Sequence, residues 1–211
     1  GISGNGQKEL LEAIAGLQIT AQGSSIGFYE RGKEDQPLQL VGKTPKKIRD
    51  AGVHLAFVPE DRLGMGLVGD MDLTDNMMLR SFRNGRSMFT DRKAPKDLAQ
   101  TVVNDLEVVT PGLSTPVRRL SGGNVQKVLV GREISSCPTV LMTAYAVRGL
   151  DINSSYTIYN LINEQKEKGS AVIFVGEDLD VLLELADRIL VLCGGEVSGL
   201  VDGRTTDQNT V

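Results

Sequence analysis

Short apolar runs and amphipathic segments alternate along this chain, an arrangement that few folds accommodate. The apolar runs occupy residues 54–58, 139–143, 171–175 and 188–193. Segments with apolar residues at helical spacing lie between several of them. The alternation predicts an α/β protein with a mainly parallel sheet and helices on its faces.

Capping residues and apolar spacing locate the helices of this pattern. The first helix is expected to bury Leu10, Ile14 and Leu17. A short helix should follow Thr44, a good N-cap, with Pro45 at its first position. The two later helices should pack on the sheet. Their predicted apolar stripes are Ile152, Tyr156, Tyr159 and Ile162 in the first, and Leu179, Leu182, Leu183 and Ala186 in the second.

Two segments depart from the alternation. Residues 25–29 and 37–41 flank a polar stretch and predict antiparallel edge strands. Between residues 71 and 136, methionines and charged residues replace the sheet pattern. We interpret residues 71–136 as a helical subdomain inserted into an α/β core that comprises residues 1–70 and 137–211.

Charge and composition restrict the classes of partner. The chain has 23 Lys and Arg against 27 Asp and Glu, a net charge of −4. Nucleic acid is therefore an unfavoured partner, because duplex binding needs a basic surface. No apolar stretch approaches the roughly 18 residues that cross a bilayer, so a role at a membrane would require another subunit.

No metal site is predicted. Cys137 and Cys193 are interpreted as free thiols, and His54 as a strand residue.

A glycine-rich stretch precedes the first predicted helix. Such a loop can turn its backbone N–H groups toward a phosphate. A phosphate loop would have lysine at Gln7 and serine or threonine at Lys8. Lys8 cannot replace that lysine, because successive helix residues point about 100° apart. A structural turn is an equal alternative. The candidate nucleotide-binding residues are Ser3, Gly4, Asn5, Gly6, Gln7 and Lys8.

A more specific motif, LSGGNVQK, occupies residues 120–127 before another predicted helix. Ser121 is a good N-cap, so an ordinary helix start is the alternative interpretation. The order of the segments argues against that alternative. A glycine-rich loop is followed by Phe57-Val58-Pro59-Glu60, the helical insertion, LSGGNVQ, a strand with Arg148-Gly149-Leu150-Asp151, and a strand with Glu177-Asp178.

In this order the chain resembles the nucleotide-binding domains of ABC transporters over nearly its whole length. It looks most like the second, C-terminal domain of the double-domain ATP-binding subunits of simple-sugar and nucleoside importers, leaning toward the nucleoside branch. The phrases VPEDRLGMGLV, TPGLSTPVRRLSGGNVQK and GEDLDVLLELADRI carry this closer resemblance. The resemblance implies a P-loop NTPase-like fold with a RecA-like ATP-binding core. It also implies that the N-terminal strands are truncated, because the strand that holds the phosphate loop would precede Gly1.

The resemblance implies losses at the catalytic positions. The catalytic strand should end in an Asp-Glu pair, but Ala144 and Tyr145 stand there. Glu177 replaces the histidine expected after the next strand, and Glu60 replaces the glutamine expected after the His54 strand. Phosphoryl transfer depends on positioning and charge stabilisation. We therefore expect ATP and Mg²⁺ to bind weakly or not at all in this domain's own site, and hydrolysis there to be poor.

The signature segment is intact, and in this family it completes the nucleotide site of the partner domain. The resemblance assigns that role to Leu120, Ser121, Gly122, Gly123, Asn124 and Gln126. Gly149, Leu150 and Asp151 match the segment that contacts the partner, although Asp151 could simply be an N-cap.

The implied partners are a second nucleotide-binding domain in the same polypeptide, membrane permease subunits and, indirectly, a substrate-binding protein. The implied location is peripheral, on the cytoplasmic face of the cell membrane. Residues 60–76, including Met65 and Met71, would contact the permease, although both methionines could equally be core residues. Two alternatives remain: a soluble ABC ATPase that is not linked to transport, and a non-catalytic docking or regulatory module.

Overall fold

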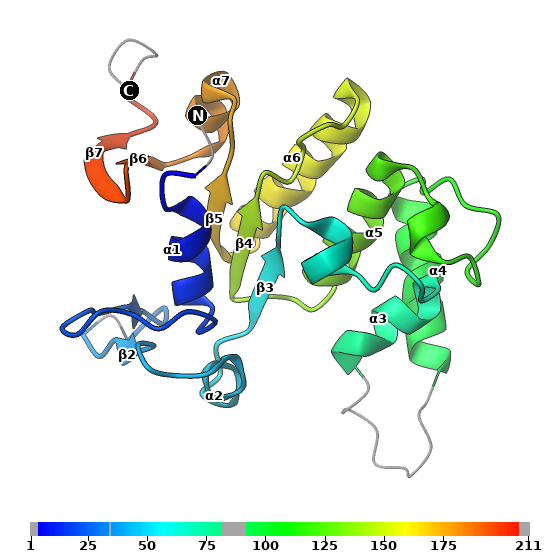
Figure 1. Cartoon of the computed structure of the whole chain (residues 1–211), viewed down its shortest axis with the longest axis horizontal. Helices are drawn as coiled ribbons and strands as arrows, with labels where there is room; N and C mark the ends of the chain where they lie inside the picture. The colour runs from blue at the N-terminus through cyan, green and yellow to red at the C-terminus, as the bar shows by residue number, and fades with distance from the viewer. Residues whose placement is uncertain (1–3, 34, 82–91, 207–211) are drawn as a thin grey trace. The chain divides into compact units, whose positions relative to one another are not determined.

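The computed structural model describes residues 4–33, 35–81 and 92–206 (Figure 1). The chain divides into two compact units, one comprising Gly1–Leu55 with Ile173–Val211 and the other Ala56–Val172. The boundaries of the helical subdomain, residues 71–136, therefore remain a prediction. Ser3 lies outside the described residues.

The N-terminal part of the first unit contains two short helices and a small sheet. Its elements are α1 (Gln7–Ile14), β1 (Gly27–Phe28), β2 (Leu38–Gln39) and α2 (Pro45–Asp50). β1 and β2 pair antiparallel, as the sequence predicts. α2 begins where the Thr44 hydroxyl accepts the backbone N–H of Lys47 at 3.4 Å, which confirms the predicted cap.

The buried face of α1 differs from the prediction. Leu11 is fully buried, whereas Leu10 is 38% exposed and Leu17 is 54% exposed. The helix ends at Ile14, and Gly16 follows with φ +74°. Leu17 therefore lies beyond the helix, and the predicted stripe through Leu10 and Leu17 is wrong.

The C-terminal part of the first unit holds α7 (Leu179–Leu185), β6 (Arg188–Cys193) and β7 (Glu196–Asp202). The sequence predicts β6 as a strand of the main sheet, but β6 pairs antiparallel with β7 in a separate two-stranded sheet. Gly194 and Gly195, both with positive φ, turn the chain back between them. A Gly-Gly pair between two apolar runs is a hairpin signal, so β7 was predictable. The apolar residues of α7 are only half-buried.

The second unit contains most of the helices. Its elements are β3 (Leu55–Val58), the π-helical turn η1 (Arg62–Gly66), α3 (Leu73–Ser81), α4 (Lys93–Asp105), the 3₁₀ turn η2 (Val117–Arg119), α5 (Gly122–Ile134), β4 (Val140–Ala144) and α6 (Ile152–Glu167). A three-stranded sheet has the order β3-β4-β5, with β5 at Ala171–Val175. The arrows of β3 and β4 point the same way (Figure 1), and every residue of β4 is buried. The predicted strands at these three places are confirmed.

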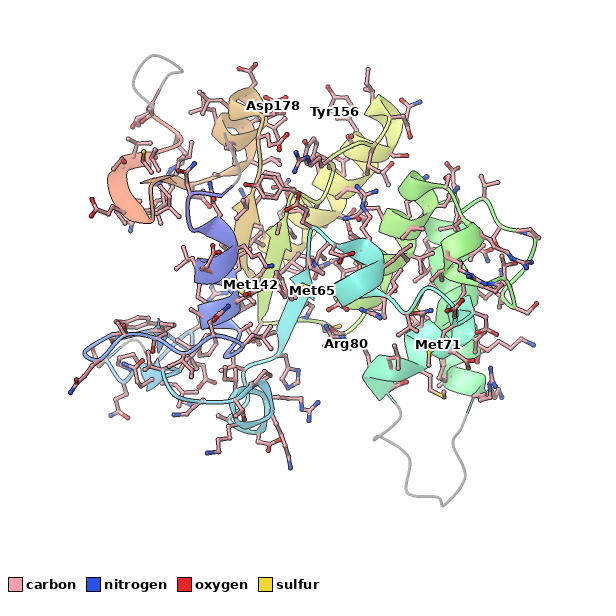
Figure 2. The ribbon with its side chains drawn as sticks, in the orientation of Figure 1. Met65, Met71, Arg80, Met142, Tyr156 and Asp178 are labelled. Carbon is pink, nitrogen blue, oxygen red and sulfur yellow. The ribbon has the colours of Figure 1, made fainter. Side chains whose placement is uncertain are left out.

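The helices of the second unit pack in sequence, α3 on α4, α4 on α5, and α5 on α6. α6 buries Ile158 and Ile162, but Ile152 is 74% exposed and Tyr156, labelled in Figure 2, is 63% exposed. The predicted stripe is therefore wrong at its first two residues. The buried face follows Ser154, Ile158, Ile162 and Gln165, whose spacing keeps them on one side of the helix.

A buried ionic network ties η1, α3, α5 and β3 together. The fully buried Glu133 carboxylate accepts hydrogen bonds from Nε and Nη2 of Arg132, at 3.0 and 2.8 Å, and from the Arg80 guanidinium. It also accepts the backbone N–H of Phe57 at 3.2 Å. Arg132 donates in turn to the carbonyl of Gly66 at 2.6 Å. Burial lowers the pKa of Arg132, and the nearby Glu133 carboxylate opposes that shift.

Candidate functional site

Ser121 caps α5, and the cap is exposed. Its φ of −64° and ψ of 157° are extended, and its Oγ accepts the backbone N–H of Asn124 at 3.4 Å. Ser121 and Gly122 are both exposed, while Leu120 is half-buried. The first N–H groups of a helix have no intrahelical partner, so this end of α5 presents hydrogen-bond donors and a positive dipole end to solvent.

Both signature glycines lie in tight surroundings. A Cβ at Gly122 would lie 3.2 Å from Nη1 of Arg62, and one at Gly123 would lie 3.3 Å from Oγ of Ser154. The Arg62 guanidinium donates to the carbonyl oxygens of Gly122, at 3.4 Å, and of Arg148. Burial lowers the pKa of Arg62. Arg62 therefore links the start of α5 to the loop that follows β4, a contact that the sequence analysis missed.

The last residue of β4, Ala144, and the residue after it, Tyr145, carry no carboxylate. Ala144 and Tyr145 are both buried, and Tyr145 has φ +52°, a left-handed conformation that bulky residues rarely adopt. The guanidinium of Arg148 lies 5.7 Å from the centre of the Tyr145 ring and 2.5 Å from Oε1 of Glu60. A methyl group and a phenol ring thus stand at the two positions where the resemblance leads one to expect acidic side chains.

Asp151 caps α6, as its alternative interpretation proposed. Its Oδ1 accepts the backbone N–H of Ser154 at 3.0 Å, and its Oδ2 accepts the Ser154 hydroxyl at 2.7 Å. These hydrogen bonds lower the pKa of Asp151, the backbone bond more than the side-chain bond. Gly149 precedes it with φ +70°, and the N–H of Leu150 bonds to the carbonyl of Val147. A contact of this segment with a partner domain remains a prediction.

The glycine-rich loop in the first unit uses one of its own donors internally. Gly4 and Gly6 have φ of +90° and +99°. The backbone N–H of Asn5 donates to Oε1 of Gln7 at 2.9 Å, so the Gln7 side chain occupies a donor that a phosphate would need. The N–H groups of Gly194 and Gly195 donate to Oδ1 and to the carbonyl of Asn5, at 2.9 and 3.2 Å, and tie the loop to the β6–β7 turn.

Lys8 and Glu177 are both exposed. The Lys8 ammonium is 66% exposed and 3.7 Å from Oε1 of Glu12 on the next turn of α1. Glu177 is exposed and follows β5.

Solved structures of ATP-binding cassettes share this fold. A dimeric cassette in a post-hydrolysis state with ADP and Pi matches with a TM-score of 0.76 and 20% identity, over 98% of this chain and 84% of that chain. A nucleotide-free cassette from an ABC transporter matches with a TM-score of 0.74 and 19% identity, over 100% of this chain and 81% of that one. These matches establish the α/β cassette fold that the sequence predicts.

Curated import proteins are similar in sequence, whereas no family model matches the chain. The xylose import ATP-binding protein of Moorella thermoacetica is 36% identical over 202 residues, 94% of this chain and 38% of that protein. The guanosine import ATP-binding protein of Bacillus subtilis is 34% identical over 99% of this chain and 39% of that protein. The chain is a homologue of sugar and nucleoside import ATP-binding proteins. It spans about two fifths of the length of these relatives.

The side chains of Gln7, Lys8 and Ala144 do not fit magnesium. Magnesium prefers oxygen ligands in octahedral geometry. An ammonium group at Lys8 and a methyl group at Ala144 supply none, and the amide oxygen of Gln7 accepts the N–H of Asn5.

One signature residue of the cassette carries an unexplained buried amide. Gln126 on α5 is fully buried, and neither its amide nitrogen nor its amide oxygen has a hydrogen-bond partner among the described residues. The sequence gives no signal for this, because LSGGNVQK specifies the residue but not its surroundings.

No membrane span is present among the described residues, where each helix is too short or too polar to cross a bilayer.

Proposed function

We propose that this cassette belongs to an ABC-type importer that couples ATP binding and hydrolysis to uptake of a simple sugar or a nucleoside. In the proposal it hydrolyses poorly and donates Ser121, Gly122 and Gly123 to the ATP site of a partner cassette. The observation that carries this assignment is the contrast within the second unit. An exposed, serine-capped helix end stands beside a loop with Ala144 and Tyr145 at the acidic positions.

The donor half of the proposal rests on the chemistry of the start of α5. A hydroxyl, backbone N–H groups and the helix dipole all favour a negatively charged phosphate group. A side chain at either glycine would meet Arg62 or Ser154, so both positions favour glycine. Such donors stabilise charge that develops on the phosphate during transfer.

The degenerate half of the proposal rests on two further contacts and on one charge. Gln7 takes a loop N–H that would otherwise bind phosphate. Arg148 is paired with Glu60, so its charge is already neutralised. Glu177 would repel a phosphate group. Together these features support weak ATP binding, without magnesium, in the cassette's own site.

The proposed partners follow from the relatives and from the surface of the second unit. Two relatives are import ATP-binding proteins, one for xylose and one for guanosine. We propose that the cassette lies at the cytoplasmic face of the cell membrane and contacts permease subunits, with a substrate-binding protein acting indirectly through them. The partner cassette would belong to the same polypeptide. The proposed permease contact includes the exposed apolar residues of segment 60–76, which are Leu63, Met65, Val68 and Met71.

ATP turnover of the chain alone and of its assembly with a partner cassette tests this function. The isolated chain should release no more phosphate than a buffer blank, and the assembly should hydrolyse ATP. Turnover of the isolated chain on the order of 1 per second, an ordinary enzyme rate, would contradict the degenerate assignment. An assembly whose turnover is the same with and without this chain would instead indicate a docking or regulatory module.

A further inference from the structure

The side chain of Asn124 bridges Ser121 and the loop that follows α4. Its Nδ2 donates to Oγ of Ser121 at 2.9 Å, and its Oδ1 accepts the backbone N–H of Val109 at 2.9 Å. Because a backbone N–H can only donate, the amide oxygen must face Val109 and the amide nitrogen must face Ser121. The orientation of the Asn124 amide is therefore fixed by its neighbours.

This orientation determines what the Ser121 hydroxyl can do. Its oxygen accepts two N–H groups, one from the Asn124 side chain and one from the Asn124 backbone at 3.4 Å. A hydroxyl oxygen has two lone pairs and one hydrogen. With both lone pairs engaged, the hydrogen points away from Asn124. Ser121 is exposed and donates this hydrogen to no residue that the structure describes. The hydroxyl is therefore held as a donor toward solvent.

The loop that holds Asn124 is itself fixed. Glu107 adopts φ +50°, a left-handed conformation, and the N–H of Val108 bonds to the carbonyl of Val103 at 2.9 Å. Val109 is 77% exposed, and its backbone N–H makes the hydrogen bond to Asn124.

We propose that Asn124 is a positioning residue that keeps the Ser121 hydroxyl oriented as a hydrogen-bond donor to a phosphate group of a nucleotide bound by the partner cassette. The proposal rests on the function proposed above. A hydrogen-bond donor that is oriented before the reaction stabilises the charge that develops on the phosphate in the transition state, because the donor does not have to reorient during the reaction. Asn124 would act only through Ser121 and would not contact the nucleotide itself.

Two substitutions distinguish a wrongly oriented Ser121 hydroxyl from one that has only lost its contact with Asn124. Asn124→Asp keeps an acceptor for Val109 but removes the donor to Ser121, so the hydroxyl would turn and donate to the new carboxylate. Asn124→Leu removes both contacts without adding charge. In the ATPase assembled with its partner cassette, we expect kcat to fall roughly 10²-fold for Asn124→Asp. For Asn124→Leu we expect a fall of about tenfold, with KM nearly unchanged in both variants. Asn104→Leu, at an exposed position of α4, is the matched control and should leave kcat unchanged.

A double-mutant cycle tests whether Asn124 acts through Ser121. Ser121→Ala combined with Asn124→Leu should be no slower than Ser121→Ala alone, because the hydroxyl to be oriented is then absent. Asn124→Gln, which keeps both amide groups, should recover part of the loss. The positioning role would be overturned if the losses of kcat in Ser121→Ala and Asn124→Leu multiplied in the double variant. It would also be overturned if Asn124→Leu left kcat unchanged. A silent Ser121→Ala would instead overturn the proposed donor function.

Discussion

Gln7 and Ser121 differ in the hydrogen-bond donors that they leave available to a phosphate group. The Gln7 side chain accepts a backbone N–H of its own loop, so it removes a donor from the glycine-rich segment. The Ser121 oxygen accepts N–H groups from Asn124, and its hydrogen stays directed to solvent. At the level of single residues, the glycine-rich loop is closed on itself and the start of α5 is open.

Gln126 should destabilise the cassette. A buried amide without partners costs about 1–3 kcal/mol for the groups left unpaired, whereas an apolar side chain of similar size costs nothing of this kind. We expect Gln126→Met to raise the free energy of unfolding of the chain by about 1–3 kcal/mol in urea denaturation. Gln100→Met, at an exposed position of α4, should change it by less than about 0.5 kcal/mol. A loss of stability in Gln126→Met would show that the amide has partners.

Local contacts made most elements of this cassette predictable. The caps at Thr44, Ser121 and Asp151 each bond to a residue three positions along, so the sequence alone indicates them. The apolar runs likewise locate β3, β4 and β5. The exposed side of α6 was not predictable in this way, because apolar residues occur on both of its faces.

Contacts between distant residues determine the rest of the site. Arg62 reaches carbonyl oxygens 60 and 86 residues away, and Arg148 pairs with Glu60 across 88 residues. No spacing rule relates such positions. The N-cap role of Ser121 was therefore predicted correctly, whereas the arginine that crosses Gly122 was not.

The buried network around Glu133 should determine the stability of the second unit. Removing one partner of a buried ionic group leaves an uncompensated charge and typically costs about 3–5 kcal/mol. We expect Glu133→Leu to lower the free energy of unfolding by that amount, because Arg132 would then be buried without its carboxylate.

A surface pair supplies the control for this network. Glu164 and Lys168 on α6 are 54% and 64% exposed and lie 3.5 Å apart, so Glu164→Leu should cost less than about 1 kcal/mol. Combining Glu133→Leu with Arg132→Leu should recover part of the loss. Equal effects of Glu133→Leu and Glu164→Leu would contradict the assigned role of the network.

For the whole molecule, we expect a specific contact with a permease subunit through segment 60–76. Met65 and Met71 are 48% and 37% exposed, and methionine adapts well to irregular partner surfaces (Figure 2). After replacement of the exposed Cys137 and Cys193 by serine, cysteines at positions 65 and 71 should cross-link to a permease subunit in membranes. A cysteine at position 168, at the end of α6, serves as the control. Capture from position 168 alone would reject the assigned surface.

The most direct test of the donor role compares Ser121→Ala with Gln7→Ala in the ATPase assembled from this cassette and its partner. Ser121→Ala is the cleaner signature variant, because an aspartate at Gly122 would lie beside the Arg62 guanidinium and pair with it. We expect Ser121→Ala to lower ATP turnover by roughly 10²–10³-fold and Gln7→Ala to leave it nearly unchanged. Unchanged turnover in Ser121→Ala, together with lost turnover in Gln7→Ala, would contradict the donor role and would make the glycine-rich loop the active site.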